Sequence, residues 1–197
     1  HSVVATAKVA QLPSMTGGAT VELVIPAKIK DGTAIEKIPN TATILYQTPT
    51  SGGEKETPPT PPVHVTPPPT IDKKVNNETH YNLTEATEAF TYTIETQVPD
   101  GATSFVISDK LVDVLEFDGE KGGATVQING TDVTTATTIT AENKTLEVAL
   151  SADQLKNNVG QKVLVTFKAK VIEGSDLSNY IKEGVAKVPN TASYIIN

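Results

Sequence analysis

Hydrophobic and polar residues alternate along most of the chain, a pattern that predicts β-strands. The clearest case is Phe90-Thr91-Tyr92-Thr93-Ile94, where aromatic and aliphatic residues share one face and threonines the other. Beyond residue 70 the same signal predicts strands at 71–76, 88–98, 103–109, 124–128, 145–150, 161–172 and 188–196. Single helical turns are expected at 151–155 and 175–181. Many short strands separated by turns are typical of an immunoglobulin-like β-sandwich, so we expect an all-β fold.

A seven-residue phrase occurs twice in the chain. Lys37-Ile38-Pro39-Asn40-Thr41-Ala42-Thr43 returns as Lys187-Val188-Pro189-Asn190-Thr191-Ala192-Ser193, and the stretch 18–29 likewise reads like 160–171. A repeat of this kind marks two copies of one structural unit. The sequence therefore predicts the back end of one β module followed by most of a second.

We place the first module at residues 1–69 and the second at residues 70–197. The first contains expected strands at 20–29 and 41–47 and a short edge strand at 63–65, followed by a stiff proline-rich linker. These strands are too few to enclose a core of their own. We expect them to be the C-terminal portion of a preceding β-sandwich module, and the whole chain to be a piece of a larger protein.

Composition argues against two classes of partner. The formal net charge is −7 and there is no arginine, which argues against nucleic-acid binding. No apolar run approaches the roughly 20 residues that a membrane-spanning helix needs, so we expect no membrane contact. The chain also has no cysteine, so a β protein outside the cell would need another way to link its strands.

Motifs for metal, cofactor or turnover chemistry are missing from the sequence. The three histidines lack metal-ligand spacing, and no phosphate-binding glycine loop or nucleophile–base pair is present. We therefore expect no cofactor and no hydrolase activity. The carboxylates Asp113, Glu116, Asp118 and Glu120 can hold calcium in a loop, but we favour a solvated acidic turn.

Three polar residues fall on strand faces that are otherwise apolar. Positions two apart on a strand share a face, and by this rule Lys73, Asp109 and Asn190 each point toward the core. Their apolar neighbours on those faces are Ile71, Val75, Phe105, Ile107, Val188, Ala192 and Tyr194. Burying the three polar side chains separately would be unfavourable, which suggests that they meet.

Burying these three residues together permits a reaction. An apolar site lowers the pKa of a lysine and raises that of an aspartate, so Lys73 can be a neutral amine and Asp109 a neutral acid. The amine can attack the carboxamide carbon of Asn190 while Asp109 polarises the carboxamide and moves protons as ammonia leaves. The product is an intramolecular Lys73–Asn190 isopeptide bond that joins the first and last strands of the module, with Asp109 as its catalyst.

A simpler interpretation places each of these residues in solvent. Lys73 and its neighbour Lys74 form a charged run typical of a solvated strand end, and Asp109 and Asn190 can be turn residues. Lys74 also competes with Lys73 as the bonded amine, and only strand parity separates them. Glu95 is a rival acid, although its position on the strand faces it away from the core.

Four segments follow one another in the second module: Ile71-Asp72-Lys73-Lys74-Val75, Phe90-Thr91-Tyr92-Thr93-Ile94, Val106-Ile107-Ser108-Asp109-Lys110-Leu111 and Val188-Pro189-Asn190-Thr191-Ala192. Together they resemble the isopeptide-forming domain of Gram-positive pilins and surface adhesins, in particular its collagen-adhesin A-type or fimbrial D2 form. The resemblance covers 71–197, and residues 1–69 resemble the tail of a preceding module. In that family a lysine near the start, the aspartate of an Asp-x-Leu strand and the asparagine of a terminal Pro-Asn-Thr-Ala strand are the bonded pair and its catalyst. They correspond here to Lys73, Asp109 and Asn190.

The resemblance implies a structural, force-bearing module of a Gram-positive surface protein that is anchored to the cell wall, either a pilus backbone subunit or an adhesin stalk. Its partners would be neighbouring modules or pilin subunits of the same surface protein, and the bond would form once, without enzymatic turnover. The alternative function is a ligand-binding adhesin domain that recognises a host matrix protein. No exposed aromatic cluster in the sequence supplies binding hot spots for that role.

This sequence also departs from the family pattern. The pilin-motif lysine, the glutamate-box consensus and the sorting signal are not visible, so the sequence does not separate a pilus shaft from an adhesin stalk. Asn40 is the counterpart of Asn190 in the first copy of the repeat. No lysine or acid lies at the matching distance upstream of Asn40, and we predict that Asn40 is unbonded in this chain.

Overall fold

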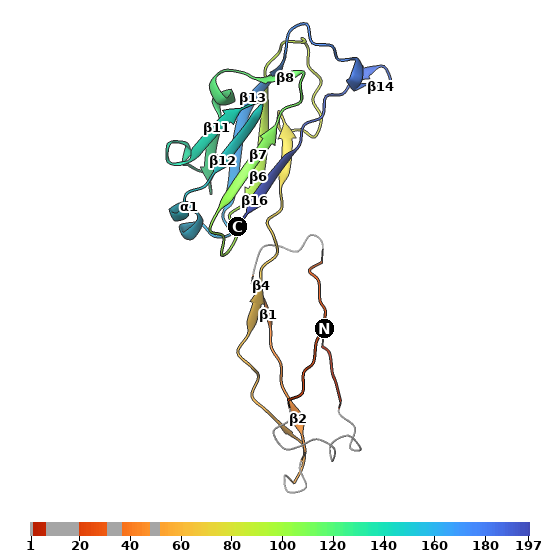
Figure 1. Cartoon of the computed structure of the whole chain (residues 1–197), viewed down its shortest axis with the longest axis vertical. Coiled ribbons are helices and arrows are strands. Elements are labelled where there is room, and N and C mark those ends of the chain that lie inside the picture. The colour runs from red at the N-terminus through yellow and green to blue at the C-terminus, as the bar shows by residue number, and fades with distance from the viewer. Residues whose placement is uncertain (1, 7–19, 31–36, 48–51) are drawn as a thin grey trace. The chain divides into compact units, whose positions relative to one another are not determined.

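The computed structural model describes residues 2–6, 20–30, 37–47 and 52–197 (Figure 1). The chain divides into two compact units, His1–Thr33 and Ala34–Asn197. The described residues of the first unit carry no helix or strand. The secondary structure of the described part of the chain therefore lies in the second unit, and most of it is strand, as the sequence predicts.

Two short antiparallel strand pairs precede residue 66. β1 (Ile38–Asn40) pairs with β4 (Val63–Val65), and β2 (Leu45–Tyr46) pairs with β3 (Lys55–Glu56). Their side chains are exposed, except that of Ile38, which is half-buried. The strand expected at 63–65 is confirmed, and it contributes no core.

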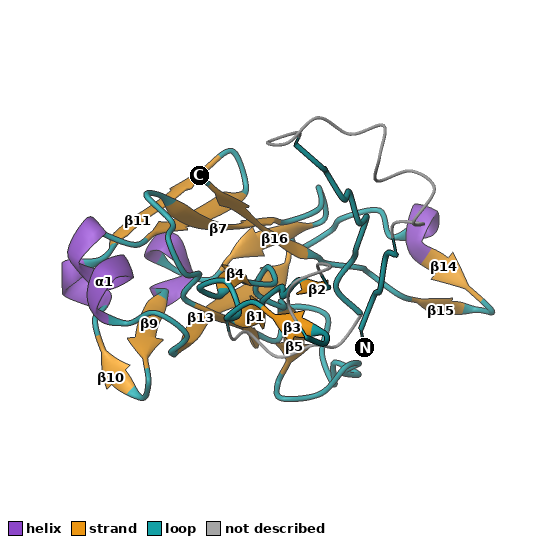
Figure 2. Ribbon diagram, turned by 90° about the horizontal axis from the view of Figure 1, so that it is seen from below, coloured by secondary structure: helices purple, strands orange, loops and turns teal. Residues whose placement is uncertain are grey.

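Two antiparallel sheets form a β-sandwich from residue 72 onward (Figure 2). The first sheet has the order β10-β9-β13-β6-β5, with β8 pairing with β13, and the second has the order β11-β12-β7-β16. The strands of the first are β5 (Asp72–Val75), β6 (Phe90–Gln97), β8 (Leu115–Phe117), β9 (Thr125–Ile128), β10 (Thr131–Asp132) and β13 (Lys162–Val171). Those of the second are β7 (Phe105–Lys110), β11 (Thr138–Glu142), β12 (Thr145–Ala149) and β16 (Ala192–Ile196). The first and last strands of the sandwich, β5 and β16, are thus edge strands of opposite sheets.

The connections hold short helices and one hairpin. They are η2 (Glu120–Gly123), η3 (Thr134–Ala136), α1 (Ala152–Asn157), η4 (Ser178–Tyr180), β14 (Ile181–Lys182) and β15 (Val185–Ala186). α1 begins with the expected cap, because the Gln154 amide donates to Ser151 Oγ at 3.3 Å and the Ser151 amide donates to Gln154 Oε1 at 2.7 Å. Asn129 and Gly130 link β9 to β10 with φ of 49° and 79°, the left-handed pair that a type I′ turn requires.

Alternation along the central strands builds the core between the sheets. β6 buries every second side chain from Phe90 onward, and β13 buries every second one from Val163 to Val171. The opposite sheet contributes Phe105 and Ile107 of β7. Each strand therefore has one core face, and the polar residues on that face are the ones that need partners.

The stretch 20–29 is the main difference from the prediction, because it is not a strand. Its alternation matches that of β13, which obtains its hydrogen-bonded ladder from β6, β8 and β9. No described residue outside the sandwich supplies equivalent partners to 20–29. An alternating sequence marks a strand face, but a strand forms only where a neighbouring backbone satisfies its amides and carbonyls.

Several strand boundaries also differ from the prediction. β16 begins at Ala192 instead of 188, since Pro189 has no amide hydrogen to donate to a ladder. The strand expected at 41–47 is reduced to Leu45–Tyr46. The helical turn expected at 175–181 shrinks to η4, and Gly184 lies in the turn between β14 and β15. The pattern missed the short strands β1, β3, β8, β10, β11, β14 and β15.

Candidate functional site

The side chains of Lys73, Asp109 and Asn190 meet in the sandwich. Lys73 Nζ donates a hydrogen bond to Asp109 Oδ2 and forms an ion pair with it. Asn190 Nδ2 donates to the other carboxylate oxygen, Asp109 Oδ1, at 2.9 Å. One carboxyl group therefore contacts both an amine from β5 and a carboxamide from the segment before β16.

Strand parity places the lysine of β5. Lys73 lies opposite Ile94 of β6, and its side chain is 12% exposed. Lys74, the next residue, points to the other face and is 45% exposed. The structure therefore brings Lys73 to Asp109 and leaves Lys74 at the surface, beside Asp72 at 4.0 Å.

The register of the second sheet places the acid and the amide. Asp109 lies near the end of β7, between Leu146 of β12 and Ala192 of β16, and is 1% exposed. Asn190 precedes Ala192 by two residues, so its side chain is on the same face of the segment. The half-buried residues of this segment alternate with exposed ones, as the sequence predicts.

Aromatic rings cover the lysine amine. Lys73 Nζ lies 4.1 Å from the ring centroid of Tyr92 and 5.5 Å from that of Phe167, and the two rings are 5.4 Å apart. The rings exclude water from the amine while their faces interact favourably with its positive charge. Sequence reasoning assigned Tyr92 to the core face of β6 but missed its place at this site, because alternation does not reveal which partner a core residue touches.

Burial shifts the pKa values of both charged groups toward neutrality. Desolvation lowers the pKa of Lys73 from its ordinary 10.5, although the Asp109 carboxylate opposes this shift. Desolvation also raises the pKa of Asp109 from its ordinary 3.8, against the opposing effects of Lys73 and Asn190. Burial and the nearby Asp109 charge raise the pKa of Tyr92 to about 12. Burial therefore moves both groups toward their uncharged forms, while their mutual attraction opposes this.

Comparisons with known proteins bear on this fold. The chain matches no profile of a known protein family. It is 44% identical over 162 residues to platelet adherence protein A of Streptococcus gordonii, a match that covers 81% of this chain and 4% of that protein. The full-length major pilin RrgB of Streptococcus pneumoniae is similar in structure, with a TM-score of 0.52 and 16% identity over 69% of this chain and 24% of that one. The N-terminal domain of the Streptococcus gordonii adhesin Sgo0707 has a TM-score of 0.51 and 18% identity over 66% of this chain and 29% of that one.

The chain contains a β-sandwich module of the pilin and adhesin type. At these identities the solved structures establish the fold, and the predicted resemblance to such modules is confirmed. The chain spans a small fraction, 4%, of the curated relative that it matches. Within the described residues of the chain, no helix is long and apolar enough to cross a membrane.

One polar atom of the pilin-type module lacks a partner. Asn190 Oδ1 is buried, and no group in the described part of the chain donates a hydrogen bond to it. A buried carbonyl oxygen left in this state costs about 1–3 kcal/mol. The unsatisfied acceptor lies on the carboxamide that the sequence predicts to react.

Glu95, the rival acid, lies away from the site. Its carboxylate is 2.6 Å from the Lys162 amine, and both side chains are about half exposed. Glu95 lies opposite Asp72 of β5. Asp72 is the neighbour of Lys73 and faces the other way, so Glu95 is on the solvent side of the first sheet. Asp109 is the acid that meets Lys73 and Asn190 in the pilin-type module.

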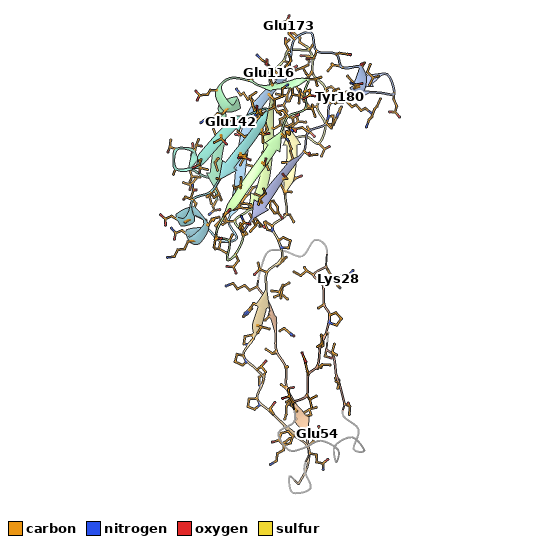
Figure 3. The ribbon with its side chains drawn as sticks, in the orientation of Figure 1. Lys28, Glu54, Glu116, Glu142, Glu173 and Tyr180 are labelled. Atoms are coloured by element: carbon orange, nitrogen blue, oxygen red, sulfur yellow. The ribbon has the colours of Figure 1, made fainter. Side chains whose placement is uncertain are left out.

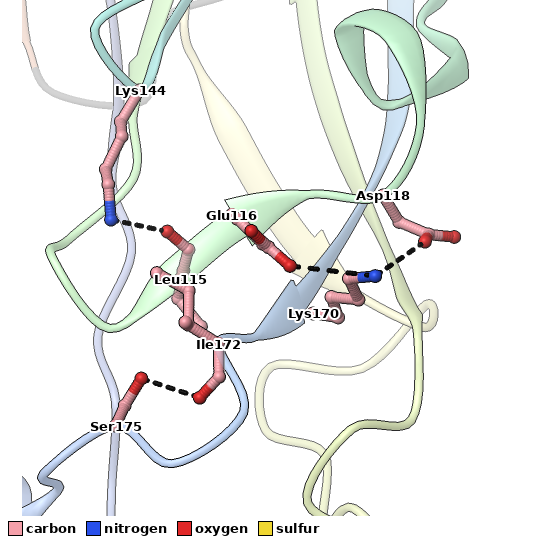
Figure 4. A network of polar contacts seen from close by, with 7 residues as sticks. All are labelled: Leu115, Glu116, Asp118, Lys144, Lys170, Ile172 and Ser175. Carbon is pink, nitrogen blue, oxygen red and sulfur yellow. Dashed lines mark hydrogen bonds and ion pairs between the residues drawn. The ribbon is translucent and has the colours of Figure 1, made fainter.

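Two carboxylates of the stretch 113–120 form ion pairs. Lys170 Nζ lies 3.6 Å from Glu116 Oε1 and 3.7 Å from Asp118 Oδ1 (Figure 4). Among the residues that the structure describes, no three His, Cys, Asp or Glu side chains are grouped to hold a metal ion. Both carboxylates balance a lysine, and Glu116 lies on β8 and not in the turn that we favoured from the sequence.

Proposed function

We propose that Lys73 and Asn190 form an intramolecular isopeptide bond with Asp109 as the catalyst, and that the bonded module carries tension in a Gram-positive surface protein. The observation that carries this proposal is the buried Asp109 carboxyl group, which contacts the Lys73 amine with one oxygen and the Asn190 carboxamide with the other. The folded module holds an amine, an amide and an acid side by side. Free side chains in water would almost never meet in this arrangement.

The proposed reaction transfers an acyl group between two nitrogens. The neutral Lys73 amine attacks Cγ of Asn190 and forms the new C–N bond. A proton passes from Lys73 Nζ through Asp109 to Asn190 Nδ2, the Cγ–Nδ2 bond breaks and ammonia leaves. An amine and a primary amide give a secondary amide and ammonia, so the step needs neither a redox partner nor a cofactor, and Asp109 regains its starting state.

The unpartnered Asn190 oxygen has a role in this chemistry. Half a turn of the carboxamide exchanges its oxygen and nitrogen, two atoms that are assigned from the hydrogen bonds they make. In that orientation a neutral Asp109 donates its O–H to Asn190 Oδ1. The hydrogen bond satisfies the buried acceptor and makes Cγ more electrophilic, and it strengthens as negative charge develops on the oxygen.

The position of the proposed bond explains how the module would resist force. The Tyr194 hydroxyl donates to the Pro69 carbonyl at 2.6 Å, while Lys73 and Asn190 both reach Asp109. β5 and β16 therefore run antiparallel, and both ends of the module leave the sandwich at the same end (Figure 1). Tension on these ends would peel the two edge strands from their sheets one hydrogen bond at a time. A covalent link between Lys73 and Asn190 stops the peeling of β5 at its second residue, and on the other side it stops the peeling at Asn190, just beyond β16.

The intact mass of the purified chain tests the proposal. We expect the unmutated protein to weigh one ammonia less than its sequence. Lys73→Met should restore the sequence mass, because it removes the amine while keeping a long apolar side chain. Lys74→Met, its matched control on the exposed face, should remain one ammonia lighter. A folded, unmutated chain at the full sequence mass would show that no bond forms.

The rate of bond formation should show a bell-shaped dependence on pH. The reactive state needs a neutral amine and a neutral acid, so the rate falls at low pH, where Lys73 takes up a proton, and at high pH, where Asp109 loses one. Burial lowers the pKa of Lys73 from 10.5 and raises the pKa of Asp109 from 3.8. The pH range over which the bond forms is therefore narrower than the range between those two ordinary values. Chain recovered unbonded from inclusion bodies can be refolded over a pH series and its ammonia loss followed by mass. A rate that keeps rising into alkali would mean that Asp109 does not act as an acid.

The name of the curated relative records adherence to platelets, and this chain spans 4% of that protein. Recognition of a host matrix protein, the alternative drawn from the sequence, is favoured by no observation on the described residues. We therefore propose that the partners of this module are the neighbouring modules or pilin subunits of its own surface protein, outside the cell. A self-made bond of this kind is formed once and is not enzymatic turnover.

A further inference from the structure

Tyr92 is the most buried of the five tyrosines, all of which the structure describes. Its side chain is 7% exposed, and its ring lies 5.3 Å from that of Phe90 and 5.4 Å from that of Phe167. A phenylalanine would fill the same space without a polar group, and a buried tyrosine usually finds a hydrogen-bond partner for its hydroxyl. The hydroxyl of Tyr92 therefore needs a partner among the groups of the site.

The Tyr92 side chain adjoins all three groups of the proposed reaction. The Lys73 amine lies over its ring, 4.1 Å from the centroid. The charge of Asp109 raises the pKa of the Tyr92 hydroxyl, and hydrogen bonding with the Asn190 side chain lowers it. A lowered pKa is the effect of a donor to the phenol oxygen, such as a carboxamide N–H. The ring face of Tyr92 thus meets the nucleophile, and its hydroxyl meets the carboxamide that the nucleophile attacks.

The same half turn that brings the Asn190 oxygen to Asp109 also brings it to Tyr92. It places Oδ1 where Nδ2 now lies, 2.9 Å from Asp109 Oδ1 and beside the Tyr92 hydroxyl. A carbonyl oxygen has two lone pairs and can accept a hydrogen bond from each of these groups. The oxygen that is buried without a donor in the present orientation thereby gains two donors.

We propose that the Tyr92 hydroxyl is a fourth catalytic group, a hydrogen-bond donor that holds the Asn190 carbonyl oxygen together with the Asp109 acid while this oxygen takes up negative charge. This inference rests on the proposed function, because it adds a residue to the same reaction. As Lys73 Nζ bonds to Cγ, the π electrons of the carbonyl move to Oδ1, and they return when the Cγ–Nδ2 bond breaks and ammonia leaves. Tyr92 keeps its proton throughout, so the balance of the reaction is unchanged.

The surroundings of Tyr92 suit it to this role. Its pKa of about 12 keeps the hydroxyl protonated while the amine and the acid change their charge. Contacts with Phe90 and Phe167 fix the position of the ring, so the donor is in place before negative charge develops. A fixed donor in a site that excludes water stabilises such a charge more than water does, because it does not have to reorient during the reaction.

Tyr92→Phe tests the inference, because it removes the hydroxyl and keeps the ring over the Lys73 amine. After refolding, ammonia loss should be slower by about 10²–10³-fold, the effect of removing one donor to a developing oxyanion. If Tyr92 only excludes water, phenylalanine does so equally well, and an unchanged rate would overturn the inference. Tyr180→Phe is the matched control, since Tyr180 is half-buried on η4, outside both sheets (Figure 3), and this variant should react at the unmutated rate. Equal slowing in both variants would also overturn the inference.

The pH dependence of the rate distinguishes a donor from a residue that acts through its neighbours. Loss of a donor lowers the rate at every pH and leaves the two flanks of the bell-shaped profile in place, because burial remains the largest influence on the pKa values of Lys73 and Asp109. A profile that shifts along the pH axis and keeps its height would mean that Tyr92 acts through those pKa values, contrary to the inference.

A second variant carries 3-fluorotyrosine at position 92 and decides the matter if Tyr92→Phe does not refold. Fluorine makes the hydroxyl more acidic and a stronger donor, so bond formation should become severalfold faster, whereas an unchanged or slower rate would contradict the inference. The unmutated chain separates this inference from the proposed function. If the folded, unmutated chain keeps its full sequence mass, the proposed function fails. If it loses ammonia and Tyr92→Phe does so at the same rate, only the role of Tyr92 fails.

Discussion

Lys73→Met should let the module unravel under tension, while the unmutated module should stay closed. The proposed bond encloses 190 − 73 = 117 positions, which can extend only if the link is absent. At 3.3–3.6 Å per residue, the variant should gain up to about 400 Å when pulled from residues 70 and 197. Single-molecule force extension measures this length directly. Lys74→Met, which alters the exposed neighbour of the same strand, should show no gain.

The same variant should be less stable to heat and protease. By analogy with a disulfide, a link that closes so long a loop stabilises by roughly 4–5 kcal/mol through the unfolded state. For a module of this size the loss corresponds to roughly 10–20 °C in Tm. Methionine fills the space of the lysine stem but leaves the buried Asp109 carboxyl without its ion-pair partner, so part of the loss in stability comes from the broken pair and not from the bond. Trypsin should reach Lys144 and Lys162 sooner in the variant.

Equal melting, proteolysis and force extension in Lys73→Met and the unmutated chain would contradict the mechanical role. The interpretation of the module as a force-bearing stalk or shaft domain would then fail as well. Loss of stability in Lys74→Met to the same extent would point to general damage of β5 instead of a missing link.

Asp109→Ala should give a folded module that forms the bond slowly or not at all. The carboxyl group both polarises the Asn190 carboxamide and carries the proton to the leaving nitrogen, and loss of a positioned acid–base group typically slows a reaction by about 10²–10⁴-fold. Ammonia loss followed by mass after refolding gives the rate. Alanine leaves the Lys73 amine buried without its partner, which itself destabilises the fold. Asp109→Asn is therefore the second variant, since it keeps the shape and the hydrogen bonding but cannot transfer the proton.

Glu95→Ala is the matched control for the acid. Glu95 pairs with Lys162 at the surface, so its loss should cost at most about 1 kcal/mol and leave the rate of ammonia loss unchanged. Ammonia loss at the unmutated rate in both Asp109 variants would show that Asp109 is not the catalyst. If Glu95→Ala loses ammonia slowly and both Asp109 variants lose it at the unmutated rate, then Glu95 is the catalyst.

Strand parity predicted which of two adjacent lysines faces the core. Alternation fixes the face of every residue in a regular strand, so it separates Lys73 from Lys74 and places Asp109 among apolar residues. The same rule identified the core face of β6. These features depend only on local sequence, which is why they were predictable.

Other features depend on partners that a local pattern does not specify. The stretch 20–29 has the alternation of β13 but no neighbouring strand, so it forms none. Tyr92 and Phe167 cover the Lys73 amine because β6 and β13 are adjacent, and that pairing is a property of the topology. The hairpin of β14 and β15 has two-residue strands, too short for an alternation signal.

A protease digest of the folded, unmutated chain, analysed by tandem mass spectrometry, tests the central claim most directly. The account predicts one branched peptide in which Lys73 and Asn190 are joined and one ammonia is missing. Fragmentation on both arms of that peptide would assign the bond to those two residues. Separate peptides that carry unmodified Lys73 and unmodified Asn190 would contradict the claim, and a link through Lys74 would contradict the assignment made from strand parity.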